Sequence, residues 1–124
     1  MAGFYYNTTV TPTSTGVKTI TCGFPPVAMK ITLSAKSVGG DSYLHQSVGQ
    51  CDNSGYSTCA SLFQDATGSQ TYKSVTKMVS HYERVSGTIT EVNSATFSAF
   101  TATEGKFNVT LVSSAYQYNI ELWG

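Results

Sequence analysis

The sequence predicts an all-β fold, an antiparallel β-sandwich or jelly-roll-like single domain. Apolar and polar residues alternate in several short stretches, which is the pattern of half-buried strands. Glycine, proline, asparagine and aspartate separate these stretches as turn residues. Charged residues make up only 11% of the 124 positions, whereas the β-branched and aromatic residues that suit a pleated surface are common. A chain of this length fits one domain.

The clearest strand is expected at Val27–Leu33, where every second residue is a large aliphatic one. A shorter strand is expected before it, at Val17–Cys22, and another after it, at Tyr43–Val48. Residues 49–55 contain glycine, aspartate and asparagine and are expected to form a turn. Tyr56–Phe63 is rich in small residues and fits either a strand or a loop.

The second half of the chain is expected to contain more strands. Tyr72–Val85 is the longest run without glycine or proline. We expect it to be one strand because of its β-branched residues, although its apolar spacing also fits a helical stripe. The other strands are expected at Thr88–Val92 and Thr96–Phe100, around a turn at Asn93-Ser94, and at Lys106–Val112 and Tyr116–Leu122.

Residues 1–16 are expected to form an extended N-terminal arm ahead of a sandwich domain at residues 17–124. The arm carries three consecutive aromatic residues, Phe4, Tyr5 and Tyr6. Full exposure of all three to solvent is unfavourable, so they are predicted to be binding residues that pack on the domain or dock on a neighbouring chain. The alternative is that this segment is the first strand of the same sandwich.

Several short motifs resemble the β-sandwich modules that tailed bacteriophages place on the virion surface, in tail fibres, tail tips and capsid decorations. A strand from Gly16 leads into a Gly-Phe-x-Pro corner, a late glycine and phenylalanine open the penultimate strand, and a tryptophan-bearing strand ends the chain. Lys106 separates Gly105 from Phe107, which are adjacent in the usual pattern. The layout is also similar to H-type lectin domains. The corner and closing residues are Gly23, Phe24, Pro25, Pro26 and Trp123.

The resemblance implies a structural phage virion protein, a small capsid decoration, cement or accessory surface protein that binds and stabilises the particle. Its partners would be other virion proteins of the capsid or tail. It would form a homo-oligomer, a trimer, because such proteins commonly sit on local threefold axes. It would be made in the host bacterial cytoplasm and located in the virion. Phe24 and Trp123 are expected to close the core at the ends of the sandwich.

The alternative function is a receptor- or carbohydrate-binding, lectin-like module of a phage tail fibre or tail tip. Tyrosine, asparagine, glutamine and serine in the region of residues 50–70 are expected to form binding loops. Aromatic rings stack on sugar rings, and side-chain amides exchange hydrogen bonds with sugar hydroxyls. A glycan is therefore the ligand expected under this alternative.

Charge and hydropathy exclude two other classes of partner. The formal net charge is zero and the seven lysines and arginines are scattered, so a nucleic-acid-binding surface is not expected. No stretch reaches the 18 apolar residues of a membrane span, so membrane insertion is not expected. The first ten residues also lack the basic and apolar regions of a secretory signal.

The sequence predicts no enzyme, no catalytic residue, no metal and no cofactor. The three cysteines, Cys22, Cys51 and Cys59, are expected to be free thiols that pack as small hydrophobic residues. A Cys51–Cys59 bridge after release of the virion is the minor alternative. The spacing of these two cysteines does not match a zinc site. His45 and His81 are expected on the surface because polar residues flank them.

Overall fold

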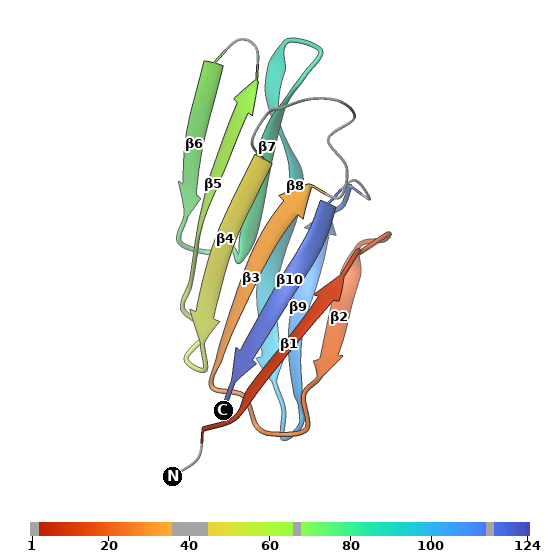
Figure 1. The fold of residues 1–124 in the computed structure, drawn as a ribbon, viewed down its shortest axis with the longest axis vertical. Helices are drawn as coiled ribbons and strands as arrows, with labels where there is room; N and C mark the ends of the chain where they lie inside the picture. The colour runs from red at the N-terminus through yellow and green to blue at the C-terminus, as the bar shows by residue number, and fades with distance from the viewer. Residues whose placement is uncertain (1–2, 36–44, 66–67, 114–115) are drawn as a thin grey trace.

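The computed structural model describes residues 3–35, 45–65, 68–113 and 116–124, and within these residues it contains β-strands and no helix (Figure 1). The predicted all-β sandwich is confirmed. The strands are β1 (Tyr5–Val10), β2 (Gly16–Thr21), β3 (Ala28–Ala35), β4 (His45–Asp52), β5 (Ser57–Asp65), β6 (Gly68–Ser74), β7 (Val79–Val85), β8 (Thr88–Phe100), β9 (Glu104–Leu111) and β10 (Tyr116–Trp123).

The strands form two antiparallel sheets that pack face to face. The first has six strands in the order β1-β10-β3-β4-β5-β6, and the second has four in the order β2-β9-β8-β7. The chain changes sheets after β1, β2, β6 and β9. The first and last strands therefore lie side by side, and both chain ends are at one end of the sandwich (Figure 1).

The core lies between the sheets and is built from the alternating positions that the sequence predicted. On β3 the fully buried side chains are Met29, Ile31 and Leu33. On β10 every second residue is buried, and the ring of Tyr118 lies 5.9 Å from that of Phe107 on the opposite sheet. Burial of each large apolar side chain contributes about 1.5–3 kcal/mol, so these strands supply much of the driving force for folding.

The predicted N-terminal arm is wrong for residues 5–10, which form the edge strand β1. This strand pairs with β10 along its whole length, from Tyr5 opposite Trp123 to Val10 opposite Tyr118. Tyr6 and Val10 face inward and pack against the core. Phe4 and Tyr5, in contrast, are 57% and 55% exposed. The segment is therefore the first strand of the same sandwich, which was the alternative prediction. Its alternate side chains, Tyr6 and Val10, pack on the core.

Two predicted elements of the second half are also wrong. Tyr72–Val85 is not one strand: the chain leaves the six-stranded sheet after β6 and enters the four-stranded sheet as β7.

The predicted turn at Asn93-Ser94 lies inside β8, which runs over 13 residues. Asn93 is fully buried, and its side-chain oxygen accepts hydrogen bonds from the backbone of Ser113 (3.2 Å) and the hydroxyl of Tyr118 (3.4 Å). These buried partners outweigh its local preference for turns.

The region of residues 50–70 is mostly strand rather than binding loops. Tyr56–Phe63 was expected to be either a strand or a loop. Nearly all of it is strand, because Ser57–Asp65 is β5 and pairs with β4 and β6. The turn between β4 and β5 is short, so the polar side chains of this region lie on the face of a sheet. This face, on the outside of the six-stranded sheet, carries the candidate site.

Candidate functional site

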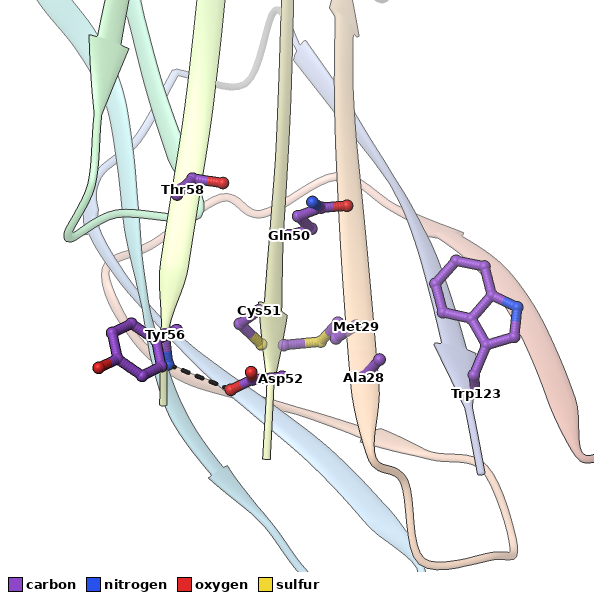
Figure 2. Close-up of a pocket in the computed structure, with 8 residues that line it drawn as sticks. All are labelled: Ala28, Met29, Gln50, Cys51, Asp52, Tyr56, Thr58 and Trp123. Atoms are coloured by element: carbon purple, nitrogen blue, oxygen red, sulfur yellow. Dashed lines mark hydrogen bonds between the residues drawn. The ribbon is translucent and has the colours of Figure 1, made fainter. Parts of the chain in front are cut away.

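A shallow pocket of about 380 Å³ lies on the outer face of the six-stranded sheet, where β3 begins and β10 ends (Figure 2). The strand register places Trp123, Ala28 and Asp52 in one row across β10, β3 and β4. The small side chain of Ala28 leaves a depression between its two larger neighbours. Tyr56 and Trp123 lie on opposite sides of the pocket. Its volume is in the range of about 300–1,000 Å³ that is typical of small-molecule sites.

Tyr56 is held in place by the turn between β4 and β5. A carboxylate oxygen of Asp52 accepts hydrogen bonds from the backbone N–H groups of Ser54 (2.8 Å) and Tyr56 (3.3 Å). Gly55 has a φ of +85°, a conformation that glycine adopts without strain. The turn is therefore fixed through its backbone, whereas the Tyr56 ring is 78% exposed. An exposed aromatic ring on a fixed turn is suited to stacking against a ligand.

Trp123 does not close the core as predicted. It is half-buried on the outer face of β10, because the inward positions of that strand belong to its even-numbered neighbours such as Leu122. Its ring lies 5.7 Å from that of Tyr5 on β1. Phe24 does close the core end: it is 7% exposed and stacks on Phe4 at 5.3 Å. We call the four residues Phe4, Tyr5, Phe24 and Trp123 the aromatic edge.

The predicted corner carries the chain from one sheet to the other. Gly23 has a φ of +85°, and its N–H and that of Cys22 both donate to the carbonyl of Thr103. Pro25 is exposed and Pro26 is buried, and neither can donate a ladder hydrogen bond. The chain leaves β2 here and enters β3 of the other sheet. The corner thus brings Phe24 against the chain end at Gly124, where it is part of the aromatic edge.

A second pocket of about 500 Å³ adjoins the first on the same outer face. Both pockets are lined by Gln50 and Thr58, which are opposite each other on β4 and β5. Two lysines, Lys30 on β3 and Lys73 on β6, line the second pocket. Gln50 belongs to the region that the sequence predicts to bind, whereas the other three residues were not predicted as binding residues. The signal for Lys30 is the strand alternation, which directs it away from the core-facing Met29 and Ile31.

His81 is fully buried, so its predicted surface position is wrong. Its Nδ1 lies 3.1 Å from the hydroxyl of Ser61 on β5, and its ring lies 5.0 Å from that of Tyr116. Histidine beside serine is a nucleophile-and-base pair in many hydrolases. Here the exposed fraction of Ser61 is 1%, so a substrate cannot reach the hydroxyl. The pair links the two sheets. The side chain of His45 lies outside the described residues.

The cysteines are free thiols in the structure, as predicted. Burial raises the pKa of the Cys51 thiol to about 12, and burial also raises the pKa of Cys59. Both thiols are therefore protonated at neutral pH and are poor nucleophiles. Within the described part of the chain, no three histidine, cysteine, aspartate or glutamate side chains come together as metal ligands.

Alkylation with iodoacetamide at pH 8 is expected to modify Cys22, which is half-buried, at least about 100-fold faster than Cys51 or Cys59. The rates are measured by mass spectrometry of the native protein, with the protein unfolded in urea as the control. Equal labelling of all three cysteines in the native protein would contradict the structure.

The pKa of the Cys51 thiol is raised from 9.0 to about 12 by folding. The free energy of unfolding is therefore expected to fall as pH rises through this interval.

An ion pair joins the start of β7 to β8. The ammonium group of Lys77 donates to both carboxylate oxygens of Glu91, at 3.0 and 2.9 Å, and the hydroxyl of Ser80 donates to the same carboxylate. Ser80 is 4% exposed, whereas the side chains of Lys77 and Glu91 are 32% and 17% exposed. The ion pair lies where the chain passes from β6 of one sheet to β7 of the other, so we assign it a structural role.

No helix among the described residues has the length and hydropathy to cross a membrane. Comparison of the chain with protein-family models, with curated proteins and with solved structures found no match.

Proposed function

We propose that this chain is a structural, non-enzymatic protein of a tailed-phage virion, a small decoration, cement or accessory surface protein. It binds other virion proteins of the capsid or tail and stabilises the particle. The observation that supports this proposal best is the aromatic edge, where Phe4 and Tyr5 are more than half exposed at the start of an edge strand. Exposed aromatic side chains are enriched in the parts of protein interfaces that contribute most affinity.

The edge strand β1 adds a second means of contact. One side of β1 pairs with β10, and the other side is an edge of the six-stranded sheet. The backbone groups at such an edge can pair with a strand of a neighbouring chain, with little demand on its sequence. We propose that copies of this chain assemble at this edge into a trimer, the number that the resemblance to phage surface proteins supplies.

The double substitution Phe4→Ser and Tyr5→Ser is expected to convert the trimer to monomers and to lower binding to purified phage particles at least about 30-fold, because truncated hot-spot aromatics each cost about 2 kcal/mol or more. Oligomer mass is measured by light scattering, and binding by sedimentation with the particles. The control is Leu111→Ser, which removes a 41% exposed apolar side chain from the other sheet. A monomeric wild-type protein would contradict the trimer, and absence of the chain from purified virions would contradict the function.

A second candidate function is a receptor- or carbohydrate-binding module of a tail fibre or tail tip. The specific observation in its favour is the pocket between Tyr56 and Trp123, with the amide of Gln50 and the hydroxyl of Thr58 beside it. Two aromatic walls with amide and hydroxyl groups between them match the faces and the hydroxyls of a sugar. A glycan array with the purified chain tests this candidate, and Tyr56→Ala is expected to abolish the signal without affecting the fold.

A further inference from the structure

We infer that the two pockets on the outer face form one groove that binds an acidic oligosaccharide. The inference rests on the second candidate function and assigns the class of sugar and the roles of the residues. Sugar rings of the ligand stack on Tyr56 and Trp123 at one end of the groove. The carboxylate groups of the ligand lie at the other end, beside Lys30 and Lys73.

The two pockets are continuous because they share part of their walls. Gln50 and Thr58 line both, and the strand register places Lys30, Gln50 and Thr58 in one row across β3, β4 and β5. Lys73 lies on the next strand, β6. From β3 to β6 the groove crosses the sheet over about 14 Å, given the usual spacing of neighbouring strands. This length and the two volumes exceed what a single small anion needs.

The floor of the groove offers hydrogen-bonding groups that the protein does not use. Gln50 and Thr58 are both exposed, and neither side chain forms a hydrogen bond with another described residue. A glutamine amide provides two donors and an acceptor, and a threonine hydroxyl provides one donor and accepts as well. Such groups match the donors and acceptors of sugar hydroxyls. They lie on β4 and β5, between Lys30 on β3 and Lys73 on β6.

The charges favour an anionic ligand. The described residues that line the second pocket include Lys30 and Lys73 but no carboxylate. Neither lysine forms an ion pair within the described part of the chain. Glu121 on β10 is the cross-strand neighbour of Lys30 and faces the same outer side, but no ion pair joins the two side chains. Asp52, at the aromatic end, accepts the hydrogen bonds of the turn.

The test measures binding of the purified chain to hyaluronan and alginate hexasaccharides and to the same hexasaccharides with their carboxyl groups reduced to alcohols. We expect at least about tenfold tighter binding of the acidic forms at low salt, and loss of this preference in 0.5 M NaCl because salt screens exposed charges. Replacing both lysines, by Lys30→Gln and Lys73→Gln, is expected to bring the affinity for the acidic forms down to that for the reduced forms. Tyr56→Ala is expected to weaken the binding of both.

The matched control is Lys18→Gln, which removes one positive charge from β2 of the other sheet and should leave binding unchanged. Binding that depends on Tyr56 but is equal for acidic and reduced forms would overturn the inference and leave carbohydrate binding in place. Equal sensitivity to Lys18 and to the groove lysines would overturn it as nonspecific attraction. Absence of binding to all four hexasaccharides would overturn the inference, and absence of any signal on the glycan array would overturn the second candidate function as well.

Discussion

Replacing Gly49 by alanine is expected to lower the free energy of unfolding by at least about 3 kcal/mol. Gly49 lies in β4 and faces the core, directly against the backbone of Met78, the residue that precedes β7 of the other sheet. A Cβ atom here would be 1.8 Å from the carbonyl oxygen of Met78 and 2.9 Å from the Cβ of Cys59. Because Met78 offers backbone rather than a movable side chain, the two sheets would have to separate locally.

The effect is measured by urea unfolding, with Ser47→Ala as the matched control. Ser47 is two residues away on the same strand and the same buried face, and its hydroxyl has no hydrogen-bond partner among the described residues. Its replacement leaves a side chain of the same size as in the Gly49 variant and should change the free energy of unfolding by less than about 1 kcal/mol. If the two variants unfold at the same urea concentration, the close approach of Gly49 to the backbone of Met78 is incorrect.

Strands whose inner faces are apolar could be predicted from the sequence alone. Met29, Ile31 and Leu33 on β3, like the buried residues of β10, alternate with polar ones, and a period of two has no other regular interpretation. The ends of such patterns were less well predicted. Val27, for example, was predicted to begin the strand, but it is 46% exposed and lies in the corner before β3.

Residues with strong turn preferences were misassigned where tertiary packing decides their position. Gly49 was predicted in a turn but occupies a strand, because only glycine lets the sheets approach there. Asn93 was predicted in a turn but is buried with side-chain partners from other parts of the chain. His81 was predicted on the surface, since its neighbours in sequence are polar. A single sequence shows the local conformational preference of each residue. The conformation and burial of these three residues are instead decided by contacts with residues far away in the chain.

The candidate site could be predicted only in part. Trp123 was singled out, but for core closure rather than for the outer face. Tyr56 was placed in a region expected to bind, although as one member of a long loop. Lys30 and Lys73 are 43 positions apart in the sequence and line one pocket because β3 and β6 belong to the same sheet. Such a pair is visible only once the strand order and register are known.

Deleting residues 2–10 is expected to lower the free energy of unfolding by at least about 3 kcal/mol, because these residues include a paired strand rather than a free arm. The deletion removes the hydrogen bonds between β1 and β10, each worth about 0.5–1.5 kcal/mol, and the partial burial of Tyr6 and Val10 on the core. It also leaves β10 as a new, unpaired sheet edge. Unfolding in urea can be followed by the fluorescence of Trp123, the single tryptophan.

The double substitution Phe4→Ser and Tyr5→Ser is the control for this deletion, because it keeps the strand and changes only exposed side chains. It should lower the free energy of unfolding by no more than about 1 kcal/mol. If the deletion is as mild as the double substitution, residues 1–16 form a detachable arm after all, and the pairing of β1 with β10 is wrong. If the deletion alone destabilises the protein, β1 is part of the sandwich. Loss of particle binding in the double substitution can then be attributed to the aromatic edge, because the fold that carries it is intact.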